Sequence, residues 1–136
     1  MAYTGQPVPS TVYNAARAKI SDGKSVKVTV PENTTIEASK FYLLGGFFGA
    51  AMQSVTTGAG ETAEVVLNIE QAEYETDQID ATQDFAAGTE IYWDGEQLTE
   101  SADDGGTPAT EYRKVGRVTV GKDTNNIIWF ILGPQI

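Results

Sequence analysis

The chain has 136 residues, of which 40% are hydrophobic and 21% are charged, a balance that permits one packed core and argues against a second large domain. Its 9 basic and 19 acidic side chains give a net charge of -10, which argues against nucleic-acid binding through phosphate neutralisation and against binding to anionic membranes. Cysteine and histidine are absent, which excludes disulfides, thiolate or imidazole zinc sites and the usual general base near neutral pH. We also expect no membrane-spanning helix and no classical export signal, because no long apolar run occurs.

The charges are unevenly distributed along the sequence. From Glu61 to Glu111 there are fifteen acidic residues and no lysine or arginine, whereas residues 1–60 hold five basic and three acidic side chains. Such asymmetry bears on the choice of partners, and it predicts a binding end and a solvent-facing end of one small domain.

Residues 1–20 are predicted to form an extended N-terminal arm. Pro7 and Pro9 favour extended conformations of the residues before them, and the helix-prone run 14–20 is too short to be stable alone. The apolar side chains of the arm have no obvious core to enter, which is typical of contacts with another chain. These side chains are Tyr3, Val8, Val12 and Tyr13.

Strands are predicted along the rest of the chain. In residues 25–30, Val26, Val28 and Val30 share one face, which is the period of a half-buried strand, and a proline ends the run. Other runs of β-branched and aromatic residues are bounded by glycine, proline or asparagine. In chain order these runs are 34–37, 40–44, 47–52, 63–69, an exposed stretch within 70–84, two short runs within 89–99, 114–120 and 126–132.

Asp94 and Gly95 separate the two runs of 89–99 and predict a β-hairpin with a two-residue type I′ turn, in which both central residues have positive φ. Residues 101–110 are predicted to be a flexible acidic loop. Short strands at this spacing, without a long amphipathic helix, predict an all-β fold. We therefore expect a compact single-domain β-barrel or β-sandwich over residues 21–136, preceded by the extended arm of residues 1–20.

No chemical motif points to an enzyme. The glycines within 45–60 lack the spacing of a phosphate-binding loop. The acidic residues could supply ligands to a hard cation or an acid pair to a glycosidase, but no EF-hand spacing and no distinguished pair occur, so a solvated acidic face is favoured. No metal or other cofactor is therefore expected.

Four aromatic side chains could form a sugar-stacking platform, as in a carbohydrate-binding module. Their places within strand patterns favour core packing instead. They are Tyr92, Trp93, Tyr112 and Trp129.

The order of the strands and several segments resemble the capsid decoration, or cement, proteins of tailed bacteriophages. The segments are SVKVTVP at 25–31, FYLLGGFFGAAMQSVTTGAGETAEVVL at 41–67, AGTEIYWD at 87–94, VGRVTV at 115–120 and NIIWFIL at 126–132.

The resemblance implies a non-enzymatic virion protein that is made in the host cytoplasm. It implies binding to the major capsid protein on the outside of an expanded head, often as a homotrimer that bridges capsomers, without contact with nucleic acid or membrane. In that setting the arm would contact the capsid or a neighbouring subunit, with Arg17 and Lys19 near capsid carboxylates. A carbohydrate-binding or adhesin-like β-module of a head fibre or tail, and a carboxylate-dependent glycosidase, remain as alternatives.

Overall fold

The computed structural model of the chain describes residues 18–136, and these residues form eleven strands and no helix. The predicted all-β class is therefore confirmed, and no helix long and apolar enough to cross a membrane occurs in this range. The strands are β1 (Ser25–Val30), β2 (Thr35–Ile36), β3 (Phe41–Leu44), β4 (Phe47–Ala51), β5 (Val55–Thr56), β6 (Ala63–Asn68), β7 (Glu73–Thr76), β8 (Glu90–Trp93), β9 (Leu98–Thr99), β10 (Arg113–Val120) and β11 (Ile128–Leu132).

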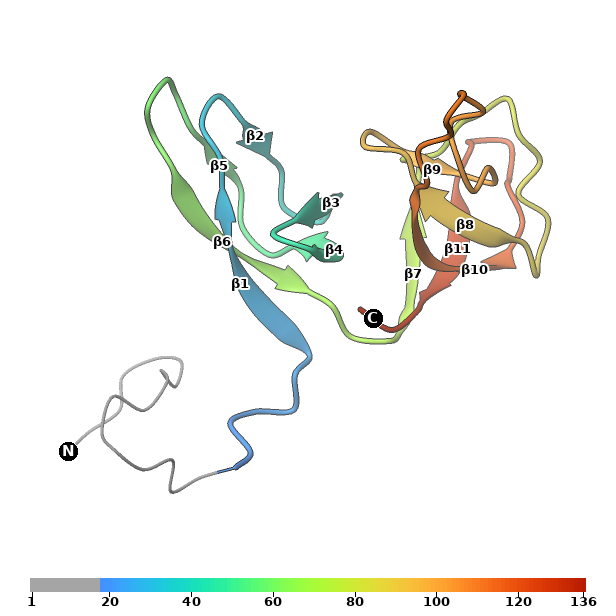
Figure 1. The fold of residues 1–136 in the computed structure, drawn as a ribbon. Helices are drawn as coiled ribbons and strands as arrows, with labels where there is room; N and C mark the ends of the chain where they lie inside the picture. The colour runs from blue at the N-terminus through green and yellow to red at the C-terminus, as the bar shows by residue number, and fades with distance from the viewer. Residues whose placement is uncertain (1–17) are drawn as a thin grey trace.

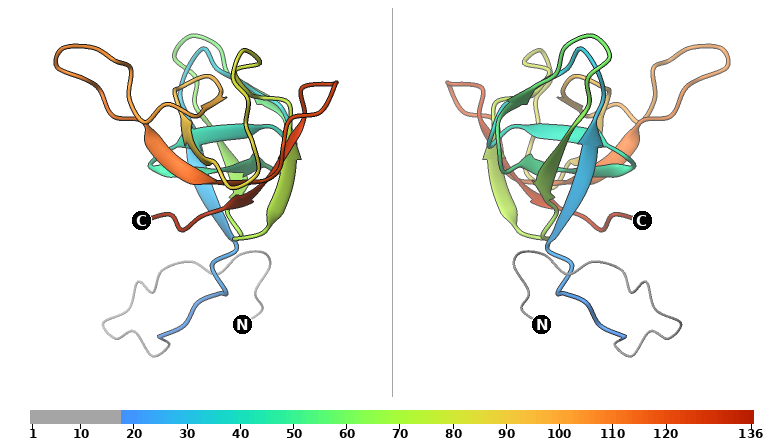
Figure 2. Two further views of the ribbon diagram at one scale, coloured as in Figure 1. Left: turned by 90° about the vertical axis from the view of Figure 1, so that its right-hand side faces the viewer. Right: turned by 90° about the vertical axis from the view of Figure 1, so that its left-hand side faces the viewer.

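The strands form two main sheets, one from each half of the chain (Figure 1). The first sheet has the order β1-β6-β4-β3 and the second has the order β7-β11-β10-β8-β9, while β2 and β5 pair separately. All pairs of these strands are antiparallel. Both sheets are curled (Figure 2), so the expected barrel or sandwich takes the form of two half-barrels.

Strand β1 has the bounds that its valine alternation predicts. Val28 and Val30 are buried, whereas Lys27 and Thr29 are exposed. Val28 lies opposite Val65 of β6, and these residues belong to an apolar cluster inside the first half-barrel. This cluster gives the first half-barrel a core of its own. Each fully buried aliphatic side chain in it contributes about 1.5–3 kcal/mol to stability.

An aromatic cluster joins the two sheets. Phe41 of β3 and Phe48 of β4 stack with their ring centroids 5.7 Å apart. Phe41 also meets Phe130 of β11, and Phe48 meets Trp93 of β8, both with centroids 5.2 Å apart. Because the rings come from both sheets, this cluster fixes the sheets relative to each other.

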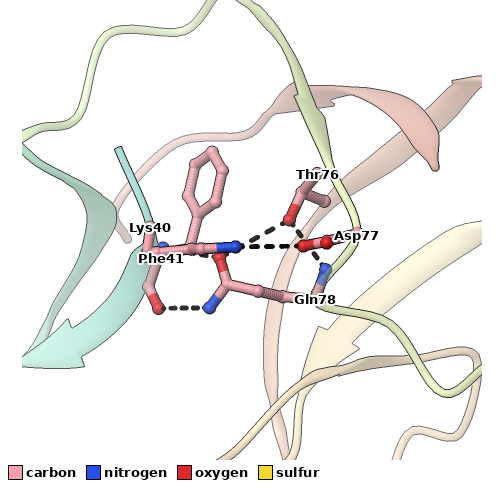
Figure 3. Close-up of polar contacts among 5 residues, drawn as sticks. All are labelled: Lys40, Phe41, Thr76, Asp77 and Gln78. Carbon is pink, nitrogen blue, oxygen red and sulfur yellow. Dashed lines mark hydrogen bonds and ion pairs between the residues drawn. The ribbon is translucent and has the colours of Figure 1, made fainter. Parts of the chain in front are cut away.

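Two glutamine side chains also link the halves of the chain. Gln78, just after β7, accepts a hydrogen bond from the Phe41 N–H and donates one to the Phe41 carbonyl (Figure 3). Gln135, near the C-terminus, makes the same pair of bonds with the backbone of Phe48, both at 2.9 Å. Each side-chain amide thus takes the place of a neighbouring peptide group.

The hairpin of β8 and β9 is confirmed, but the predicted turn is wrong. Trp93 lies opposite Leu98, the Asp94 N–H donates to the Gln97 carbonyl at 3.1 Å, and of residues 94–97 only Gly95 has a positive φ, of 107°. The physical reason is that the Asp94 carboxylate accepts hydrogen bonds from the N–H groups of Glu96 and Gln97, at 2.8 and 2.9 Å. These bonds hold Asp94 in a conformation without a positive φ, so the predicted type I′ turn, which needs a positive φ at both Asp94 and Gly95, does not form.

The acidic loop after β9 is present and has internal hydrogen bonds. The Asp104 N–H donates to the Thr110 carbonyl at 3.1 Å. The Asp104 carboxylate accepts hydrogen bonds from the N–H groups of Gly106 and Thr110, at 2.8 and 3.0 Å. The loop therefore has a defined local geometry at its base.

Candidate binding surface

The outer face of the second sheet carries exposed apolar side chains. In β11, Ile128, Phe130 and Leu132 are buried in the core. Because successive side chains of a strand point to opposite faces, Trp129 and Ile131 point outward, and they are 45% and 46% exposed.

A bulge in β10 adds a third side chain to this surface. The register between β10 and β11 shifts between Val118 and Val120, so that Val120 lies opposite Trp129. Val120 is 46% exposed although Val118 is buried. Bulges often re-aim side chains in this way. We call Val120, Trp129 and Ile131 the apolar face.

Charged side chains of both signs border the apolar face. Glu75 of β7 lies opposite Trp129 on one side. On the other side, Arg117 of β10 lies opposite Ile131 and forms an ion pair with Glu90 at 3.0 Å. An apolar centre with a polar rim is the usual composition of a protein–protein interface.

Glu90 of β8 is the carboxylate that organises the basic side of the rim. Its Oε1 lies 3.0 Å from Lys114 Nζ, and its Oε2 accepts a hydrogen bond from the Tyr92 hydroxyl at 3.1 Å. The bond with Lys114, followed by the one with Tyr92, holds the pKa of Glu90 below its usual value. The same bond to Glu90 raises the pKa of Tyr92. Glu90 is therefore ionised at neutral pH and positions the cations beside it.

A shallow groove of about 220 Å³ runs along the acidic side, between β7 and Trp129, and is lined by Glu73, Tyr74 and Glu75. The Tyr74 hydroxyl donates to the Glu70 carbonyl at 2.8 Å, and burial, together with the charge of Glu70, raises the pKa of Tyr74. An exposed indole beside carboxylates can stack on an apolar or cationic group while the carboxylates accept hydrogen bonds.

The four aromatic side chains considered as a sugar-stacking platform differ in their exposure to solvent. Trp93 is buried in the core, as expected, and Tyr92 and Tyr112 are half-buried. Trp129 is exposed, so its assignment to the core is wrong. The run at 126–132 is almost entirely apolar, and for that reason the sequence gives no sign of which face of β11 points outward.

The charge asymmetry of the sequence is not kept in space. Lysine and arginine side chains from residues 24–40 and 114–117 form ion pairs with carboxylates of the acidic stretch 61–111. The pairs are Lys24 with Glu70, Lys27 with Glu64, Lys40 with Asp77, and Lys114 and Arg117 with Glu90, at 3.0–3.6 Å. The two-ended charge arrangement inferred from the sequence is thus replaced by an interleaved one. Within residues 18–136 no three carboxylates are placed to hold a metal ion.

The predicted contact residues of the arm fall mostly before the described range. Tyr3, Val8, Val12, Tyr13 and Arg17 lie outside it. The sixth residue, Lys19, is exposed and pairs with Asp22 at 2.8 Å. The sequence did not predict the apolar face, since the nearly continuous apolar run at 126–132 carries no signal for it.

Residues 18–136 thus form a helix-free, two-sheet domain with an exposed apolar sheet face. The family model for phage cement protein matches residues 20–129, and the chain belongs to that family. No curated protein and no solved structure matches the chain significantly. Membership indicates a structural role on the phage capsid, as part of the virion, in place of catalysis.

Proposed function

We propose that this chain decorates the outer surface of the expanded phage head, binds the major capsid protein there, and stabilises the shell by bridging neighbouring capsomers as a homotrimer. The observation that carries the proposal is the family match, because residues 20–129 include nearly all of the two-sheet domain. Several copies of one weak contact, linked in an oligomer, reach high avidity without any single strong site. Such a role needs a rigid domain and no catalytic group.

The apolar face is the surface of the domain that we assign to the capsid. The apolar side chains of Val120, Trp129 and Ile131 would leave water when the capsid binds at the centre of this face. The charged side chains of both signs around them would orient the partner. A capsid surface with an apolar patch and charges of both signs would complement it.

Binding of purified variants to undecorated expanded heads tests this surface. Trp129→Ser should weaken binding by about ten-fold or more, because an aromatic anchor at the centre of an interface usually contributes about 2 kcal/mol or more. Leu43→Ser is the matched control, since Leu43 is a partly exposed apolar residue of β3, outside the apolar face. Equal binding by the two variants would contradict a role for the apolar face in capsid binding.

The arm is the second contact that we propose. Tyr3, Val8, Val12 and Tyr13 supply apolar side chains, and Arg17 and Lys19 supply positive charge, toward the capsid or a neighbouring subunit. Deletion of residues 2–18 should reduce the amount of protein bound to expanded heads, and undiminished binding would contradict a role for the arm.

A second candidate function is carbohydrate binding by a virion module such as a head fibre or tail component. The exposed indole of Trp129 beside Glu73 and Glu75 favours it, because sugar rings stack on such side chains while carboxylates accept their hydroxyl hydrogens. A glycan array with the intact protein and with Trp129→Ser separates the candidates: a glycan signal that the substitution removes, without capsid binding, would favour this function.

A further inference from the structure

Strand β7 has one open edge. It lies at the end of its sheet and pairs with β11 on one side only. The Leu132 N–H donates to the Ala72 carbonyl at 3.0 Å, so residue 72 faces β11. Because backbone groups of successive strand residues point to alternate sides, Tyr74 also faces β11, and the N–H and carbonyl groups of Glu73 and Glu75 point to the open side.

A groove of about 440 Å³ lies beside β7, between it and the ends of β4 and β6. Its lining combines apolar side chains with a few polar groups. The lining includes Phe41, Ala50, Met52, Asn68, Tyr74 and Glu75. Met52 is 56% exposed, and the Tyr74 hydroxyl oxygen lies 3.2 Å from Asn68 Oδ1. An open strand edge beside an apolar groove is the geometry of strand addition, in which the backbone of an extended segment pairs with the edge while its side chains enter the groove.

The N-terminal arm of this chain has the composition that such a site binds. Residues 10–14, with the sequence STVYN, contain β-branched and aromatic residues and no proline. Arg17 is the only charged side chain among residues 1–17, so the rest of the chain holds all nineteen acids and eight of the nine bases. Glu73 and Glu75 on β7 are therefore complementary in charge to this segment, which carries one cationic side chain and no carboxylate.

The start of the described range favours a second copy as the source of the arm. Residues 18–22 are all exposed and lead away from the two sheets (Figure 1, Figure 2). Seventeen extended residues span about 55 Å, which is enough to reach a neighbouring domain. Copies held side by side on a capsid, as in the proposed function on which this inference rests, would bring an arm and a groove together.

We propose that residues 10–14 of one copy add as a strand to the open edge of β7 in a second copy, with apolar side chains of the arm in the groove beside Met52. The arm thus links copies of this chain, and the apolar face of each domain stays free for the capsid.

The absence of cysteine from the sequence makes site-directed cross-linking unambiguous. A tagged Thr11→Cys variant is mixed with an untagged Met52→Cys variant, treated with a short bis-maleimide, and analysed for tagged-to-untagged products. The product should exceed that of Thr11→Cys with Ser101→Cys by about ten-fold or more, because bound partners hold their thiols at millimolar effective concentration. Ser101 is the control because it is exposed in the loop after β9, at the opposite edge of the sheet.

Equal yields in the two mixtures would overturn the proposal. A Thr11→Cys/Met52→Cys double variant that links only within single chains would also overturn it, because the arm would then occupy its own groove.

A pair of substitutions at Glu75 tests the backbone contact itself. Glu75→Pro removes the N–H at the open edge and leaves the bonds between β7 and β11 in place, so it should reduce the cross-linked product about ten-fold. Glu75→Thr removes the carboxylate but keeps the N–H, and it should retain most of the product. Circular dichroism checks that both variants are folded, and equal cross-linking by both would contradict strand addition.

The result is separable from the capsid-binding proposal, since cross-linking is measured without heads. Linked copies that fail to bind heads would contradict the proposed function alone. Head binding by copies that do not cross-link would contradict only the proposed strand addition between copies.

Discussion

The side-chain amide of Gln78 is paired with the backbone of Phe41 as one peptide group pairs with another. The Phe41 N–H donates to Gln78 Oε1 at 2.8 Å, and Gln78 Nε2 donates to the Phe41 carbonyl at 3.1 Å. Phe41 lies at the edge of the first sheet and Gln78 follows the edge strand of the second (Figure 3). The two sheets are therefore joined at this edge by side-chain contacts, this amide and the ion pair of Lys40 with Asp77, instead of by a strand ladder.

Gln78→Ala should destabilise the protein, because it leaves the N–H and the carbonyl of Phe41 without partners. Each partly buried group left unpaired costs about 1–3 kcal/mol, so we expect a loss of about 2 kcal/mol or more in the free energy of unfolding. Urea denaturation measures the change. Gln71→Ala, at an exposed bend before β7, is the control and should change stability by less than about 0.5 kcal/mol. Similar losses in both variants would contradict the role of the Gln78 amide.

Gly116→Ala should be strongly destabilising, because a Cβ at this position of β10 would overlap the carbonyl oxygen of Ile131. Backbone atoms cannot move aside cheaply, and overpacking of this kind costs about 1–3 kcal/mol. Gly133→Ala is the matched control, since its Cβ would meet the Val115 carbonyl at an ordinary 3.5 Å. Thermal unfolding of the two variants should show a lower midpoint for Gly116→Ala alone.

Stability should fall in acid partly because of Asp104. The hydrogen bonds from the N–H groups of Thr110 and Gly106 hold the pKa of this carboxyl below its usual value. A lowered folded-state pKa means that the ionised group stabilises the fold above the unfolded-state pKa of about 3.9, and that this contribution is lost as the pH falls through the folded-state value.

Asp104→Asn keeps an acceptor oxygen but does not titrate, so its melting temperature should fall less between pH 7 and pH 3 than that of the unmodified protein. Asp84→Asn, which removes an exposed carboxylate with no hydrogen bond among the described residues, serves as the control. Parallel pH profiles for all three proteins would show that Asp104 has no part in the acid response.

Local patterns in the sequence predicted the strands but not the contacts that join them. The alternation of Val26, Val28 and Val30 places β1 correctly, and the glycine pair at 45–46 places the corner between β3 and β4. Gln78 and Gln135, by contrast, have no local signature, because their partners lie 37 and 87 residues away in the sequence.

The sequence also did not predict the candidate binding surface, because the exposure of its side chains depends on contacts between strands. Trp129 stands in an apolar run whose outward face depends on the register with β7 and β10, and Val120 is exposed only because β10 has a bulge there. The turn after Trp93 was mispredicted because the Asp94 carboxylate binds N–H groups of its own loop, a competition that the Asp-Gly pair alone does not reveal.

Stoichiometric binding to undecorated phage heads tests the central claim most directly. Purified protein is titrated onto expanded heads and onto unexpanded heads, and the bound copies per capsid protein are counted after sedimentation. If the chain decorates expanded heads, its binding to them will saturate at a fixed ratio to the capsid protein, and the decorated heads will resist heat better. Absence of saturable binding, or equal binding to both kinds of head without added heat resistance, would contradict it.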